Sequence, residues 1–214
     1  MSFISVMITE RFLTVMADSR AVELYVNGDV HKVLDEDIDK IKILSGTVFV
    51  AVTGIVEIAQ DFIDKSNLYE EIKIDGMLKN EKYLMNWFDK KKHIINTDVD
   101  VWFKDLNLNS IPSLRFRILF GGLTKDNELK AYMIDSDTRE LSIIYYSHDR
   151  LGYNYSNSNF IDEDVLSSKF IELYKNYNGT ADSILYVQAM LNDFVAQYDE
   201  TVNTNKKSFK IVLP

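Results

Sequence analysis

The sequence contains no cysteine, two prolines and three histidines among its 214 residues. Without cysteine, the chain has no disulfide framework, no thiolate zinc site and no thiol nucleophile. The histidines, His31, His93 and His148, lie far apart in the sequence, and none has the HExxH spacing of a zinc hydrolase. We therefore expect neither a metal ion nor a cofactor.

Long apolar runs and a positive charge balance are also missing. No run approaches the roughly 20 residues needed to cross a bilayer, and Glu10 and Arg11 interrupt the N-terminal apolar region, unlike a signal peptide. The net charge of −9 disfavours non-specific binding to phosphate backbones. The one dense basic run, 90–93, suits the C-terminal end of a helix. We expect a cytoplasmic protein that binds neither nucleic acid nor membrane.

The composition is that of a folded protein, with 46% hydrophobic and 12% aromatic residues. The chain shows no internal repeat, no low-complexity tract and no linker that would divide it. A length of 214 residues suits one sizeable domain. We predict a single domain over residues 1–214.

The first quarter of the chain has the clearest strand pattern. Phe3–Ile8 and Phe12–Ala17 are rich in β-branched and large apolar residues, and the polar segment between them predicts a hairpin. The second run ends in Asp18-Ser19-Arg20, which places a carboxylate and a guanidinium where a buried strand stops. Two further strands are predicted around 40–43 and 47–52, and the second of them closes on Thr53-Gly54.

The acidic run Asp35-Glu36-Asp37, with Asp39, lies in the segment between these strand pairs. It lacks the alternating ligands and the glycine of a calcium-binding loop. We interpret it as a solvated acidic loop. The Asn27-Gly28-Asp29 turn signal before it predicts a second hairpin.

The rest of the chain alternates between helical and strand-like patterns. Helices are predicted at 55–63, 80–92, 162–176 and 181–198, three successive strands within 115–146, and a final strand at 209–213. The stretch 94–112 is interpreted as a strand fragment and loop. Short polar loops between strands favour antiparallel pairing, and apolar strands need cover on both faces. The order therefore predicts an α+β fold in which two antiparallel sheets stack between helical layers.

These segments resemble the proteasome β-subunit group of N-terminal-nucleophile (Ntn) hydrolases, including the bacterial proteasome-like proteins. The resemblance rests on Ala17-Asp18-Ser19-Arg20 after the opening hairpin and on a lysine strand followed by a strand that ends in glycine. Ser2 and Asp18 are 16 positions apart, and Lys40 and Gly54 are 14 apart, as in the family. The resemblance implies a four-layer αββα sandwich.

The family pattern also implies roles for individual residues. Ser2, exposed by removal of Met1, would be the nucleophile, with its α-amine as the base. Asp18 would orient the lysine and the nucleophile, Lys40 would tune the electrostatics, and Gly54 would donate an N–H to the oxyanion. Asp199 would be the supporting aspartate.

Three features depart from that pattern. Lys32 competes with Lys40 as the site lysine, because the segment after Asp18 is longer than usual. Glu200-Thr201-Val202-Asn203 stands where Ser-Gly-Gly normally follows Asp199. The Gly-Ser-Gly that normally follows the second sheet is missing at 146–149.

The resemblance implies a hydrolase that cleaves peptide or other amide bonds. The alternative is a non-catalytic assembly or regulatory subunit that keeps the same sandwich. Members of the family form rings or other assemblies, so we expect a homo-oligomer, either a ring or a stacked assembly.

Overall fold

The computed structural model describes residues 3–24, 30–96, 115–147, 150–156 and 161–214. Its first sheet is antiparallel and has the order β12-β1-β2-β13. The strands are β1 (Ile4–Ile8), β2 (Phe12–Asp18), β12 (Gly152–Ser156) and β13 (Lys206–Val212). Every residue of β1 and β2 is buried, because both faces of this sheet are covered. Thr9 closes the β1–β2 turn, its Oγ1 accepting from the backbone N–H groups of Arg11 and Phe12.

The second sheet is antiparallel as well, with the order β11-β10-β9-β6-β5. Its strands are β5 (Ile41–Ser45), β6 (Val48–Gly54), β9 (Phe116–Leu123), β10 (Leu129–Asp135) and β11 (Glu140–Ile143). The predicted strands at 40–52 and within 115–146 therefore belong to one sheet, joined by the β6–β9 pairing. Glycines allow close backbone packing there: a Cβ on Gly122 would lie 2.2 Å from the Thr47 carbonyl oxygen.

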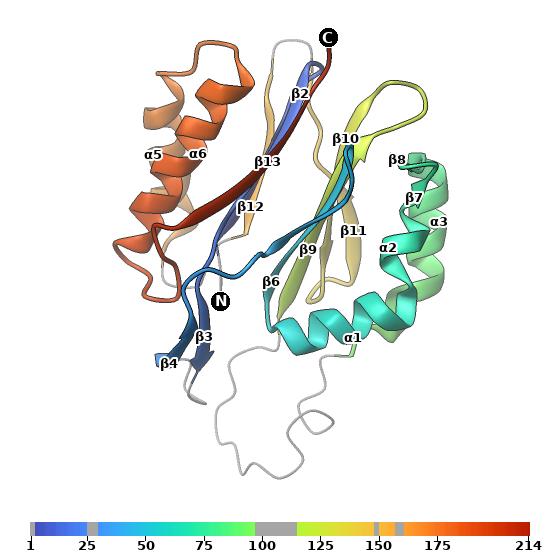
Figure 1. The fold of residues 1–214 in the computed structure, drawn as a ribbon, viewed down its shortest axis with the longest axis horizontal. Coiled ribbons are helices and arrows are strands. Elements are labelled where there is room, and N and C mark those ends of the chain that lie inside the picture. Colours follow the sequence, from blue (N-terminus) through green and yellow to red (C-terminus); the bar gives the residue numbers. More distant parts are fainter. Residues whose placement is uncertain (1–2, 25–29, 97–114, 148–149, 157–160) are drawn as a thin grey trace.

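Helices cover the outer face of each sheet (Figure 1). On one side lie α1 (Val56–Ser66), α2 (Leu68–Glu71), α3 (Glu81–Lys91) and the 3-10 turn η1 (Lys92–Ile94), with the small β7 (Lys73–Ile74) and β8 (Met77–Leu78) pair. On the other side lie α5 (Glu163–Tyr174) and α6 (Ala181–Ala196). Asn80, Asp162 and Thr180 cap α3, α5 and α6 by accepting backbone N–H bonds. The predicted four-layer αββα sandwich is confirmed.

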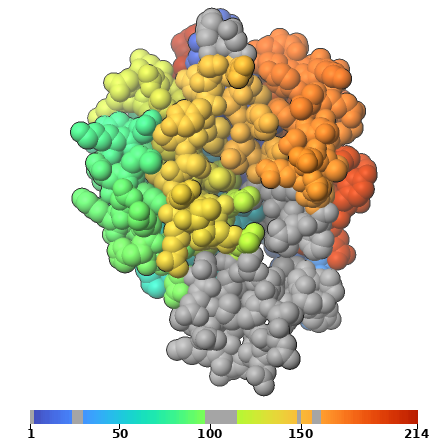
Figure 2. Space-filling model, turned by 180° about the vertical axis from the view of Figure 1, so that it is seen from behind, coloured from blue at the N-terminus to red at the C-terminus, as the bar shows by residue number. Residues whose placement is uncertain are grey.

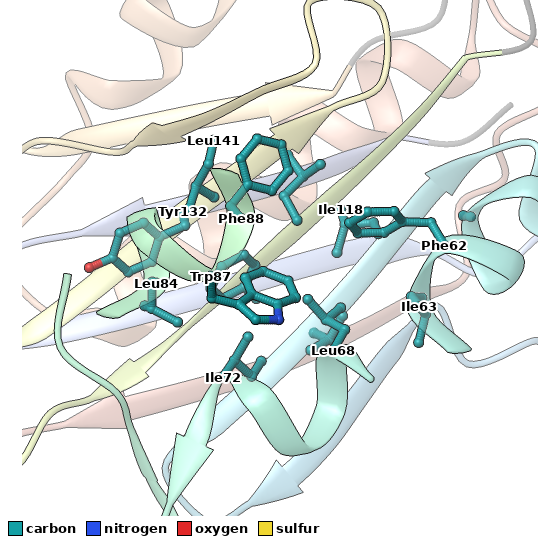
Figure 3. Packing of buried hydrophobic residues seen from close by; sticks show 14 of the residues in the cluster. Phe62, Ile63, Leu68, Ile72, Leu84, Trp87, Phe88, Ile118, Tyr132 and Leu141 are labelled. Carbon is teal, nitrogen blue, oxygen red and sulfur yellow. The ribbon is translucent and has the colours of Figure 1, made fainter. Parts of the chain in front are cut away.

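Three hydrophobic clusters fill the spaces between these four layers. One lies between the two sheets, with Val15 and Ile4 facing Phe49 and Leu119. The other two lie under the helices. Figure 3 shows the cluster beneath α1–α3, where Trp87 and Phe88 of α3 pack with Tyr132 of β10.

Two parts of the fold differ from the sequence-based expectation. Residues 152–156, where no strand was predicted, form the edge strand β12 on β1. Tyr153 and Phe170 there lie with ring centroids 4.6 Å apart, so aromatic packing on α5 stabilises this strand. The final strand begins at Lys206 and is longer than predicted. Most of the stretch 94–112 lies outside the described residues.

Figure 2 shows the opposite face of the molecule from Figure 1. On this face, green α3 and orange α5 lie on opposite sides, with yellow to light-orange segments between them.

A separate two-stranded hairpin, β3 (Ala21–Leu24) and β4 (Val30–Asp35), follows β2 and extends beyond the sandwich (Figure 1). This is the second hairpin that the sequence predicts, although its turn residues 25–29 lie outside the described residues. None of the helices in the described ranges is long and apolar enough to span a membrane.

Candidate active site

Two of the predicted site residues form an ion pair between the sheets. Asp18 is the last residue of β2 in one sheet, and Lys40 immediately precedes β5 in the other. The Lys40 Nζ donates to Asp18 Oδ2 at 2.7 Å, and the two side chains are 5% and 0% exposed. Lys32, the competing lysine, lies on the exposed strand β4. Of these two lysines, Lys40 is therefore the one that contacts Asp18.

Backbone groups also hold the Asp18 carboxylate. The Phe3 N–H donates to Asp18 Oδ1 at 2.8 Å, and the Arg20 N–H donates to Oδ2 at 3.1 Å. The Asp18 N–H in turn donates to the Phe3 carbonyl oxygen. Asp18 is thus fixed against the residue that directly follows Ser2. Ser2 itself lies outside the described residues.

Burial and charge act in opposite directions on this ion pair. Burial lowers the pKa of Lys40 below its ordinary value, and the neighbouring Asp18 carboxylate, followed by the more distant charge of Asp199, opposes that shift. Burial likewise raises the pKa of Asp18, against the pull of Lys40 and of the two backbone donors. Opposed shifts of this kind, from burial and from a specific charge partner, are typical of ionisable groups at functional sites.

Gly54 ends β6 at the same end of the sandwich. Its φ is +95°, and an added Cβ would lie 2.2 Å from the Arg115 carbonyl oxygen, so only glycine fits. Strand N–H groups alternate between the two edges. The Gly54 N–H therefore lies on the same edge as that of Val52, which donates to the Lys40 carbonyl oxygen at 3.2 Å. The pairing of β6 with β5 extends along β6 only as far as Ala51. The Gly54 N–H therefore lies beyond the paired residues, on the edge of β6 that faces Lys40.

Asp199 follows the C-terminal end of α6 and is 1% exposed. Its Oδ1 accepts from the Thr201 N–H at 2.8 Å and from the Thr201 hydroxyl at 2.6 Å. Its Oδ2 is buried and has no hydrogen-bond partner among the described residues. A buried carboxylate oxygen without a donor is costly. This atom therefore has the capacity to accept one more hydrogen bond near Lys40.

Comparisons with known proteins indicate what kind of fold carries these residues. No protein-family model matches the chain, and no curated protein matches it. Solved structures do match. "Anbu (ancestral beta-subunit) from Yersinia bercovieri" is 14% identical, with a TM-score of 0.67 over 98% of this chain and 82% of that chain. The chain has a proteasome-like fold.

Two further Anbu structures agree with the first. An "Anbu (Gly-1) mutant" from Hyphomicrobium sp. strain MC1 is 10% identical, with a TM-score of 0.63 over 97% of this chain and 80% of that one. The "Helical Assembly of the Anbu Complex from Pseudomonas aeruginosa" is 12% identical, with a TM-score of 0.62 over 98% and 81%. At these identities, the likeness shows the fold alone.

The comparisons correct the sequence-based assignment. The prediction that this proteasome-like chain is a member of the proteasome β-subunit family of Ntn hydrolases is wrong in that specific form. The three matching structures named above are Anbu proteins, which are proteasome-like but distinct. The cause is physical: Asp18, Lys40 and Gly54 stand at strand ends of this sandwich, and the spacings between them reflect its geometry. They do not distinguish one group of proteins with this fold from another.

A hydrogen-bond network that the sequence did not predict surrounds the Asp18–Lys40 pair. Glu36, from the acidic run, pairs with Arg20 at 3.0 Å, and its Oε2 also accepts from Asn203 Nδ2 at 2.8 Å. Asn203 Oδ1 accepts from the Ser19 N–H. Lys207 pairs with Asp37 at 2.8 Å. Asp35, Glu36, Asp37 and Asp39 are exposed, in agreement with a solvated acidic run, and Glu36 and Asp37 also bind two other segments of the chain. Within the described ranges, no group of His, Asp and Glu side chains could hold a metal ion.

Proposed function

We propose that the chain is an N-terminal-nucleophile hydrolase that cleaves peptide or other amide bonds, with Ser2 as its nucleophile after Met1 removal. One observation carries the proposal: the buried Asp18 carboxylate binds both the Lys40 Nζ and the N–H of Phe3. Because Ser2 is bonded to that Phe3 nitrogen, this contact ties the ion pair to the N-terminal residue. We propose that it acts as a single domain in the cytoplasm.

The proposed reaction needs no group from outside the chain except water. The Ser2 Oγ attacks the substrate carbonyl carbon while the α-amine takes the hydroxyl proton. An α-amine has a reference pKa of about 7.7–8.0, which suits proton transfer near neutrality. The C–N bond then breaks, and the amine product leaves with that proton. Water attacks the acyl-enzyme, releases the acid and restores the Ser2 hydroxyl.

The described residues supply the supporting roles. The Gly54 N–H is the proposed oxyanion donor, because it lies past the paired part of β5 on the side of Lys40. The Lys40 ammonium disfavours a second positive charge nearby and so keeps the α-amine neutral. The unpaired Asp199 Oδ2 is the proposed acceptor for an N–H of that amine.

A second function is favoured by a specific observation, namely that the segment after Asp199 lacks Ser-Gly-Gly. In this chain the Thr201 hydroxyl occupies Asp199 Oδ1, and Arg20 donates to the Glu200 carbonyl oxygen at 2.6 Å. These two acceptors are therefore taken up by contacts within the chain, as a non-catalytic assembly or regulatory subunit would allow. With either function we propose a homo-oligomer, since the Pseudomonas aeruginosa Anbu protein forms a helical assembly.

The test is hydrolysis of peptide nitrophenyl esters and peptide amides by the wild type, Ser2→Ala and Ser2→Thr. Alanine and threonine are both small enough for Met1 removal; relative to serine, Ser2→Ala removes only the hydroxyl, and Ser2→Thr keeps it and adds a methyl group. The proposal predicts activity in the wild type and in Ser2→Thr, and loss in Ser2→Ala by a factor of about 1,000 or more. Absence of activity from a wild type that assembles and lacks Met1 favours the non-catalytic subunit.

A further inference from the structure

Glu36 joins segments from three distant parts of the chain beside the candidate site. Its Oε2 accepts from Arg20 Nε at 3.0 Å and from Asn203 Nδ2 at 2.8 Å. Its backbone carbonyl accepts from the Ser19 Oγ at 2.8 Å and again from Asn203, at 2.9 Å. Glu36, in the long segment between Asp18 and Lys40, thus binds both the end of β2 and the segment that follows α6.

The two side-chain partners of Glu36, Arg20 and Asn203, are connected to Asp18 and Asp199, which have proposed roles in the reaction. Arg20 donates its backbone N–H to the Asp18 carboxylate and its side chain to the Glu200 carbonyl oxygen. Asn203 accepts the Ser19 N–H and lies four residues after Asp199. Asp18 and Asp199 come from different ends of the sequence, and Arg20, Glu36 and Asn203 connect their two segments.

Charge gives Glu36 a second effect. The charged groups that act on Lys40 are Asp18, Asp199 and Arg20, and Arg20 lowers the pKa of Lys40. Glu36 pairs with the Arg20 guanidinium and offsets part of that charge. Asp37, the next residue, pairs with Lys207 on β13. The two adjacent carboxylates therefore have different partners, only one of which contacts the site.

We propose that Glu36 is a positioning residue of the hydrolase site: it holds the Arg20 and Asn203 segments in register and neutralises Arg20 beside Lys40. This role rests on the proposed function. This role also explains how the site is built without Ser-Gly-Gly after Asp199. The Glu36 side chain, from the long segment between Asp18 and Lys40, fixes the loop after Asp199.

The test compares Glu36→Ala and Glu36→Gln with Asp37→Ala and Asp37→Asn, which remove the neighbouring carboxylate. Amide hydrogen exchange at Ser19, Arg20 and residues 199–205 measures the positions of the two segments. For Glu36→Ala we expect faster exchange at these amides and a kcat about tenfold lower with little change in KM, because orientation is lost but substrate contacts are kept. Asp37→Ala leaves these amides and kcat near their wild-type values.

The charge effect is measured by the pH dependence of kcat/KM. Glutamine keeps the shape of Glu36 but leaves Arg20 unneutralised, which disfavours the protonated forms of Lys40 and of the α-amine. The acidic limb of the profile is therefore expected to move to lower pH by a few tenths of a unit in Glu36→Gln, and not in Asp37→Asn.

The results separate this inference from the proposed function. An active wild type whose Glu36 variants match the Asp37 variants in exchange, in kcat or in the acidic limb overturns the role of Glu36 alone. A wild type that lacks Met1 and shows no turnover overturns the proposed function, and the catalytic role of Glu36 falls with it. Faster exchange, lower kcat and the shifted limb together support both.

Discussion

The Lys40 ammonium and the Asp18 carboxylate form a buried ion pair at 2.7 Å between the ends of two sheets. Replacing Lys40 by methionine leaves the carboxylate buried with only the backbone donors of Phe3 and Arg20 among the described residues. Loss of one partner of a buried pair costs about 3–5 kcal/mol in the free energy of unfolding. Urea unfolding of Lys40→Met at neutral pH measures this loss.

The matched control is Lys42→Met, on β5 two residues after Lys40. Lys42 is exposed and its Nζ lies 3.9 Å from the centroid of the Tyr69 ring. A cation–π contact at such a site contributes about 0.5–1 kcal/mol. Equal losses in the two variants would show that the Asp18–Lys40 pair has no special part in stability.

Gly54→Ala is expected to be more harmful than Gly179→Ala, although both glycines have positive φ values, +95° and +85°. Left-handed backbone costs an alanine about 1–2 kcal/mol at either position. At Gly54 the new Cβ would also collide with the Arg115 carbonyl oxygen, whereas nothing lies within 4 Å at Gly179. We expect Gly54→Ala to lose about 3 kcal/mol or more. Urea unfolding of both variants tests the difference.

Asp199→Asn is expected to separate activity from stability. The buried Oδ2 has no partner among the described residues, so a neutral amide relieves a desolvated charge. We predict an unfolding free energy equal to or above that of the wild type. Turnover is expected to fall about 100-fold, because the proposed acceptor for the α-amine is lost.

The control for this variant is Asp193→Asn, at the same end of α6. Asp193 is more exposed than Asp199 and forms an ion pair with Lys206. This variant should keep its turnover. A stability loss in Asp199→Asn with full turnover would contradict the assigned role of Asp199.

The contribution of Glu36 to stability is expected to depend on pH. Its hydrogen bonds to Arg20 and Asn203 lower the pKa of Glu36 below its ordinary value of 4.5. A lowered folded-state pKa means that this stabilisation is complete above the unfolded-state value and is lost as pH falls through the folded-state value. Unfolding of the wild type and of Glu36→Gln at pH 7 and pH 3 should show a difference in stability that shrinks at pH 3. A constant difference would contradict this.

The order of elements could be predicted because periodicity is local. The opening strands, the strands within 115–146 and all four long helices follow from apolar spacing, and Asn80 and Asp162 cap two of these helices in the structure. Strand β12 was missed because its stability comes from pairing with β1 and from packing of Tyr153 on Phe170, both non-local.

The site residues likewise divide into those that the sequence could predict and those that it could not. Asp18, Lys40 and Gly54 were proposed from the resemblance to a known family, because each lies at a strand end with the family's spacing. Glu36 and Asn203 were not, because they are 167 positions apart and only the folded chain brings them together. The acidic run was a signal for Glu36, but its composition alone indicated contact with solvent and not an ion pair with Arg20.

The most direct test of the nucleophile is the mass of the N-terminal peptide after brief treatment of the untagged protein with a peptide nitrophenyl ester. The account predicts a peptide that begins at Ser2 and carries the acyl group on its Oγ, and an unmodified peptide from Ser2→Ala. Retention of Met1 in every copy, or an acyl group on another residue with Ser2 free, would contradict it.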